Sequence, residues 1–111
     1  MGMLIWLANS TTVATAGTQV QISNTSERVL WIRFRPNEAN AAGQAVYVGE
    51  SDVSLTNGWS LQEPLAGKPT EELELPINRE GLGSVLLSEF WVDSQTDGGI
   101  VDWVAFVSGG G

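Results

Sequence analysis

The sequence predicts an all-β protein, namely an antiparallel β-sandwich of about eight strands in jelly-roll or immunoglobulin-like order. Apolar and polar residues alternate over most of the chain, which is the period of a half-buried strand. Gly, Pro, Asn and Asp separate these segments at intervals of about ten residues, as in sandwiches and barrels. No stretch combines the length and the period of a stable helix. The 111 residues fit a single domain.

The N-terminal residues 1–17 are expected to form an arm that contacts a partner. They contain an apolar stretch that no basic residue precedes, and this stretch is far shorter than the roughly 20 residues of a membrane-spanning helix. We therefore expect neither a signal peptide nor a membrane anchor. The sandwich is expected to occupy residues 18–107, and residues 108–111 to form a flexible tail.

The first two strands of the sandwich are expected at residues 19–23 and 29–35. Both alternate, and successive side chains of a strand point to opposite faces of the sheet. The core side of the second strand would carry Leu30, Ile32 and Phe34, and its other side Trp31, Arg33 and Arg35.

Later segments continue the pattern. Residues 44–49 precede a turn at 56–58, and residues 72–77 alternate, with Leu73, Leu75 and Ile77 directed inward and the glutamates outward. A hairpin turn at 97–99 is expected to join the strand at 89–93 to the strand at 100–107. The last strand is apolar on both sides, which predicts that it is central in its sheet or covered on both faces.

The composition argues against an enzyme. Histidine and cysteine are absent. Histidine is the one side chain that ordinarily titrates near neutral pH, and the cysteine thiolate is a common nucleophile and metal ligand. We expect no catalytic residue, no metal and no cofactor. Residues 93–98 have the oxygen-rich spacing of a calcium loop, but Val104 stands where the loop requires glutamate. Among the acids, Asp102 is expected to be partly buried in a structural hydrogen bond, and an acid/base hydrolase built on Asp102 or Asp93 is the weakest alternative.

The charge is unevenly distributed. The net charge is −8, although residues 1–36 hold three arginines and one glutamate. Residues 37–111 hold two basic and twelve acidic residues. Such an anionic surface repels phosphate backbones, so no nucleic-acid partner is expected.

Five tryptophans point to binding surfaces, because indoles are frequent anchors of interfaces. Trp103 is expected to fill the core, together with either Trp31 or Trp91. Trp6, in the apolar arm, and Trp59, directly after a turn, would be exposed unless a neighbour covers them. The predicted interface consists of Leu4, Ile5, Trp6, Leu7, Trp31, Arg33, Arg35 and Trp59.

The layout of several segments is similar to that of small β-sandwich structural proteins of tailed bacteriophages. The segments are residues 45–53 (AVYVGESDV), residues 56–61 (TNGWSL), the strand at 72–77, and the closing pair at 90–93 and 100–104. The resemblance covers about four-fifths of the chain and transfers no residue roles. It implies a non-enzymatic virion protein, most often a capsid decoration or cement protein, made in the host cytoplasm and placed on the capsid surface. It also implies a homo-oligomer, preferentially a trimer, bound to the major capsid protein.

The alternative function is a carbohydrate-binding module, or the receptor-binding tip or fibre piece of a phage particle. In that case Trp31, Trp59 or Tyr47 would stack against sugar rings.

Overall fold

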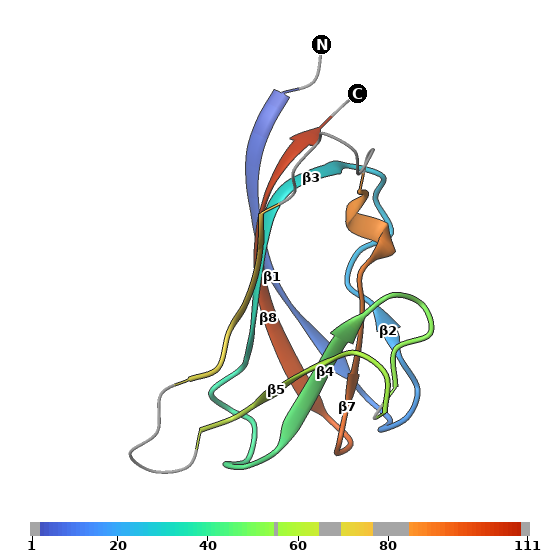
Figure 1. Ribbon diagram of the computed structural model, residues 1–111, viewed down its shortest axis with the longest axis vertical. Coiled ribbons are helices and arrows are strands. Elements are labelled where there is room, and N and C mark those ends of the chain that lie inside the picture. Colours follow the sequence, from blue (N-terminus) through green and yellow to red (C-terminus); the bar gives the residue numbers. More distant parts are fainter. Residues whose placement is uncertain (1–2, 55, 65–69, 77–84, 110–111) are drawn as a thin grey trace.

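Two antiparallel sheets face each other in the computed structural model, which describes residues 3–54, 56–64, 70–76 and 85–109 (Figure 1). A 3₁₀ turn, η1, is the one helical segment among these residues, and it is too short to cross a membrane. The elements are β1 (Met3–Val13), β2 (Val20–Gln21), β3 (Arg28–Pro36), β4 (Ala45–Gly49), β5 (Trp59–Gln62), β6 (Leu73–Pro76), η1 (Leu87–Glu89), β7 (Trp91–Ser94) and β8 (Gly99–Gly109).

The strand order is that of a jelly roll. Sheet A has the order β1-β8-β3-β6, and sheet B has the order β2-β7-β4-β5. Every connection along the chain therefore passes from one sheet to the other, except the turn between β4 and β5. The antiparallel sandwich predicted from the sequence is confirmed, and of its two expected orders the structure has the jelly roll.

The core lies between the sheets. It consists of the apolar side chains that point inward at every second position of the strands. Phe34 of β3 is fully buried, and its ring centroid lies 5.5 Å from that of Phe90. Strand β8 lies between β1 and β3, as its apolar sequence predicted. The other buried core residues include Ile32, Val46, Val48, Val92, Val101, Trp103, Ala105 and Val107.

The N-terminal segment differs from the expected arm, because Met3–Val13 forms β1 of sheet A. It pairs with β8 along its whole length, from Met3 opposite Gly109 to Val13 opposite Gly99. The alternation explains this position, since Ile5 and Leu7 pack against the core while Trp6 faces outward. Residues 108 and 109, expected in the flexible tail, belong to β8, which continues to Gly109.

A bulge changes the register at the start of β3. The pairing with β8 shifts between Val29 and Trp31, so Val29 is fully buried in place of Leu30. The predicted inward position of Leu30 is therefore wrong, while Ile32 and Phe34 point inward as predicted. A β-bulge adds one residue to a strand and so reverses the alternation beyond it.

The turn before β8 is not a hairpin, because β7 and β8 belong to different sheets. Gly98, with φ of +82°, donates its backbone N–H to the carbonyl of Val13 at 2.7 Å. At Gly99, a Cβ would overlap the Ser94 side chain. The glycines that indicated a hairpin thus allow a tight arch between the two sheets. The local composition of a hairpin and of an arch is the same, so it does not distinguish them.

The remaining expected strands are present, but two of them have different ends: β2 comprises only Val20–Gln21 of the expected residues 19–23, and β7 begins at Trp91, after η1, and not at residue 89. A turn joins β4 to β5, with Asn57 and Ser54 in an isolated bridge. In β6, Leu73 and Leu75 pack against the core. Ile77, predicted to point inward as well, lies outside the described residues.

Candidate functional site

The outer face of sheet A carries most of the predicted interface residues. Antiparallel pairing places Trp6 of β1 and Trp31 of β3 on either side of Phe106 in β8. The next row that faces the same way contains Ala8, Val104 and Arg33. Aromatic side chains therefore lie at one end of this face, and charged side chains lie farther along the strands, toward Arg35 and Asp102.

The first row forms an aromatic cluster of Trp6, Trp31 and Phe106. The ring centroids of Trp6 and Phe106 lie 4.7 Å apart, and those of Trp6 and Trp31 lie 5.7 Å apart with the rings nearly perpendicular. Trp6 nevertheless stays 64% exposed because it belongs to an edge strand. Exposed, clustered aromatic side chains are typical of contact surfaces.

An ion pair holds Trp31 in place. Arg33 Nη2 lies 2.7 Å from Glu74 Oε1, and Trp31 Nε1 donates a hydrogen bond to Glu74 Oε2 at 3.1 Å. The Arg33 guanidinium carbon lies 5.3 Å from the centroid of the Trp31 ring, within the range of a cation–π contact. The three side chains thus fix one another at the border of the aromatic cluster.

Glu74 should make the stability of the protein depend on pH. The hydrogen bond from Arg33, and after it the one from Trp31, lowers the pKa of Glu74 below its usual value of 4.5. A lowered pKa in the folded state stabilises the fold above the unfolded pKa, and this contribution disappears as the pH falls through the lowered pKa. We expect Glu74→Gln to reduce the free energy of unfolding at pH 7, and the difference from the wild type to vanish at low pH.

Urea unfolding of both proteins at pH 7 and at a pH well below 4.5 measures this effect. Glu50→Gln is the matched control, since it removes an exposed carboxylate directly after β4 of sheet B that takes no part in the ion pair of Arg33. Because all three groups are exposed or half-exposed, the effect should be modest. A Glu74→Gln deficit of equal size at both pH values would contradict the role of the ion pair.

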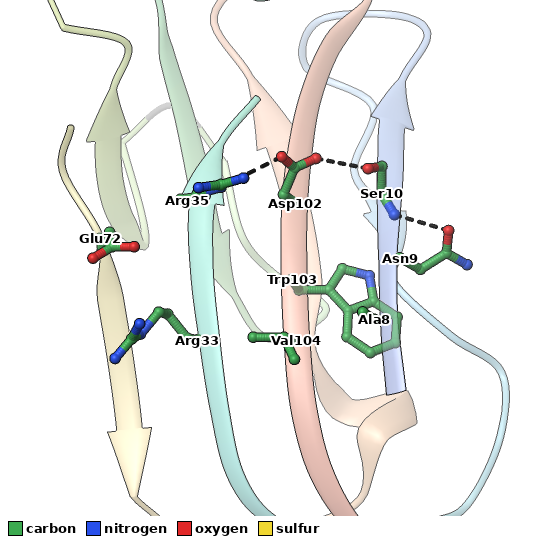
Figure 2. Close-up of a pocket in the computed structure, with 9 residues that line it drawn as sticks. All are labelled: Ala8, Asn9, Ser10, Arg33, Arg35, Glu72, Asp102, Trp103 and Val104. Atoms are coloured by element: carbon green, nitrogen blue, oxygen red, sulfur yellow. Dashed lines mark hydrogen bonds and ion pairs between the residues drawn. The ribbon is translucent and has the colours of Figure 1, made fainter. Parts of the chain in front are cut away.

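Asp102 joins three strands at the charged end of the face (Figure 2). Its Oδ1 accepts hydrogen bonds from Ser10 Oγ at 2.6 Å and from Asn37 Nδ2 at 2.8 Å. Its Oδ2 lies 3.5 Å from Nε of Arg35. Asp102 is half-buried, and these contacts match the structural hydrogen-bonding role expected from the sequence.

A shallow, open hollow of about 450 Å³ lies around these polar groups. Figure 2 shows the side chains that line it, which come from β1, β8, β3 and the residue preceding β6. Arg33 and Arg35 extend along one side, and Ser10 lies on the other. The hollow offers both hydrogen-bond donors and hydrogen-bond acceptors beside the aromatic cluster. Its lining is Ala8, Asn9, Ser10, Arg33, Arg35, Glu72, Asp102, Trp103 and Val104.

The other predicted interface residues lie elsewhere. Ile5 and Leu7 are half-buried and point toward the core, and Leu4 lies in β1 opposite Ser108. Trp59 is 65% exposed, but it belongs to β5, at the edge of sheet B. The structure therefore brings Trp6, Trp31, Arg33 and Arg35 onto one face and leaves Trp59 on the other sheet.

Sequence reasoning missed two members of this arrangement and one buried acid of sheet B. The sequence predicted Phe106 only as one apolar residue of the last strand. Because Phe106 and Val104 are two residues apart, they face the same side of that strand. The contact of Glu74 with Arg33 was not predicted, because the two residues are 41 positions apart in the sequence.

Asp93, and not Asp102, is the fully buried acid. Its Oδ1 accepts backbone hydrogen bonds from Ser94 at 2.7 Å and from Gly17 at 3.0 Å.

Within the described part of the chain, no three acidic residues gather where they would hold a metal ion. Comparison with known proteins finds no matching family model, no similar curated protein and no similar solved structure.

Proposed function

We propose that this protein is a non-enzymatic structural protein of a virus particle, a decoration or cement protein that binds the capsid lattice. The outer face of sheet A is the binding surface, and the major capsid protein is the partner. Bound copies strengthen the shell by burying apolar surface, at roughly 25 cal/mol per Å², and no chemical step is needed.

The observation that carries this proposal is the aromatic cluster. Trp6, Trp31 and Phe106 lie together on the outer side of sheet A, and Trp6 is largely exposed. Trp is among the residues that contribute most to binding energy when an interface buries them. The arginines beside the cluster add polar contacts at its border, where interfaces are usually polar.

Two further observations agree with the proposal. The jelly-roll order is common among viral capsid domains, but also among lectins, so the fold alone does not decide the function. The two acids considered for catalysis, Asp93 and Asp102, both hold neighbouring strands and loops together by hydrogen bonds. This favours structural roles for them.

The second candidate function is carbohydrate binding, and the hollow beside the aromatic cluster favours it. An oligosaccharide with one ring stacked on Trp31 or Trp6 would extend along the strands over the hollow, where Ser10, Arg35 and Asp102 supply hydrogen-bonding groups. Pockets of this volume accommodate small ligands.

Co-sedimentation separates the two functions. Purified protein is mixed with virus particles that are made from the genome encoding this chain but lack the protein. A decoration protein should sediment with the particles to a saturating stoichiometry, and free glycans should not compete. Failure to bind such particles would contradict the proposal, while saturable binding to a glycan array would establish the second candidate.

A further inference from the structure

The turn between β4 and β5 contains Asn57, the one asparagine of the chain that a glycine follows. Asparagine is a thermolabile residue, because the backbone nitrogen of the next residue can attack its side-chain amide. Glycine has no side chain to shield that nitrogen, so it permits the close approach. Asn57 and Gly58 are both exposed, and water therefore reaches the groups that would react.

The fold requires the glycine at this position. Gly58 has φ of +139°, a value that residues with a side chain rarely adopt. A Cβ would lie 2.7 Å from Cγ2 of Val53 and 2.9 Å from the carbonyl oxygen of Val48. Any other residue at position 58 would thus force the neighbouring chain to move, so the turn itself keeps the glycine beside Asn57.

The side-chain amide of Asn57 is held by a single hydrogen bond. Its Nδ2 donates to the carbonyl of Asp52 at 3.1 Å. The amide of Asn40, by contrast, is held at both ends, because Nδ2 donates to the carbonyl of Ile100 at 2.8 Å and Oδ1 accepts from the N–H of Ile100 at 2.9 Å. The amide of Asn57 can therefore turn toward Gly58 at the cost of one exposed hydrogen bond, which contributes little to stability.

The backbone nitrogen of Gly58 is also accessible. No residue that the structure describes accepts a hydrogen bond from its N–H. The glycine that follows Asp97 shows the opposite arrangement, since the N–H of Gly98 donates to the carbonyl of Val13 at 2.7 Å. Of these two glycine nitrogens, that of Gly58 is thus the one available to react.

We propose that Asn57 deamidates spontaneously in the folded protein, through a cyclic imide that it forms with Gly58. The backbone nitrogen of Gly58 forms a bond to Cγ of Asn57, and the bond between Cγ and Nδ2 breaks. The amide nitrogen leaves as ammonia and takes the proton of the Gly58 N–H. Water then opens the ring, at Cγ to give aspartate or at the backbone carbonyl to give isoaspartate. The attack is favoured because both groups belong to the same turn.

The products should loosen this turn and add a negative charge to the net charge of −8. A carboxylate accepts hydrogen bonds but cannot donate one, so the contact with the carbonyl of Asp52 is lost. Isoaspartate also lengthens the main chain by one atom, between the bridge of Ser54 with Asn57 and the start of β5. The pairing of Trp59 with Val48 follows directly after this point. The inference concerns sheet B and does not depend on the proposed virion function.

Peptide mapping by mass spectrometry, on the folded full chain incubated in mildly alkaline buffer, tests the proposal. We expect Asn57 to react at least about tenfold faster than Asn40, which corresponds to a barrier lower by about 1.4 kcal/mol. Isoaspartate is the decisive product, because direct hydrolysis of the amide yields only aspartate. Asn57→Gln is the matched control. It keeps an amide, but the ring that it must form is one atom larger, so the charge change measured by ion exchange should disappear.

Circular dichroism before and after incubation establishes that the protein stays folded while it reacts. An unchanged Asn57 in the folded protein, after a time in which the urea-unfolded chain has reacted, would overturn the proposal. So would aspartate at position 57 without isoaspartate, equal conversion of Asn57 and Asn40, or the same charge change in Asn57→Gln. If Asn57→Gln does not fold, the peptide map of the wild type decides alone.

Discussion

Phe34→Ala is expected to lower the free energy of unfolding by about 3–5 kcal/mol, the range for a buried phenylalanine. Phe34 is fully buried between the sheets and contacts the ring of Phe90. Removing the ring leaves a cavity that two rigid sheets cannot close. Because domains of this size are stable by about 5–15 kcal/mol, this one change removes a large share of the total. Urea unfolding followed by tryptophan fluorescence measures it.

Two other variants calibrate this result. Phe106→Ala removes the same ring from the half-buried outer face of sheet A, so it should cost less than about 2 kcal/mol. Ile32→Val, at another fully buried position, should cost about 0.5–1.5 kcal/mol and remains measurable if Phe34→Ala does not fold. Equal losses for Phe34→Ala and Phe106→Ala would contradict the division of sheet A into a core side and an outer side.

Trp6→Ala is expected to weaken binding to the virus particle by about 30-fold or more. This corresponds to about 2 kcal/mol, the lower limit for an indole that anchors an interface. Trp6 is 64% exposed in the free protein, so its removal should leave the fold almost unchanged. A binding isotherm from co-sedimentation measures the affinity, and urea unfolding verifies that the fold is intact.

Trp59→Ala is the matched control. Trp59 is 65% exposed, so both variants remove equally accessible indoles, but Trp59 lies on sheet B, away from the aromatic cluster. We expect Trp59→Ala to bind within about twofold of the wild type, since most residues outside the anchor set contribute little. Equal losses in the two variants would contradict the assignment of the binding surface to the outer face of sheet A.

The sequence was sufficient for the fold class because strand alternation is a local signal. Residues 29–35 and 100–107 alternate, and their strands occupy the predicted faces except where the bulge at Val29 and Trp31 reverses the pattern. The position of β8 in the middle of its sheet followed from its two apolar sides. The choice between a hairpin and an arch at Gly98 did not follow, because both use the same turn residues and differ only in which sheet the next strand joins.

The site was predicted in part for the same reason. Alternation placed Trp31, Arg33 and Arg35 on one side of a strand. It could not show that Trp6 and Phe106 lie beside Trp31, because that row depends on the registers of β1 and β3 with β8. These registers join residues that are far apart in the sequence, 100 positions for Trp6 and Phe106 and 75 positions for Trp31 and Phe106. Residues 1–17 were assigned to an arm because their apolar stretch was interpreted as a surface for partners, although it also satisfies the alternation of β1.

Electron cryomicroscopy of particles decorated with the wild-type protein tests the binding surface most directly. We predict density for the jelly roll with the outer face of sheet A against the shell, and with the indoles of Trp6 and Trp31 covered by the major capsid protein. A bound molecule that turns sheet B to the shell and leaves Trp6 in solvent would contradict the role assigned to the aromatic cluster.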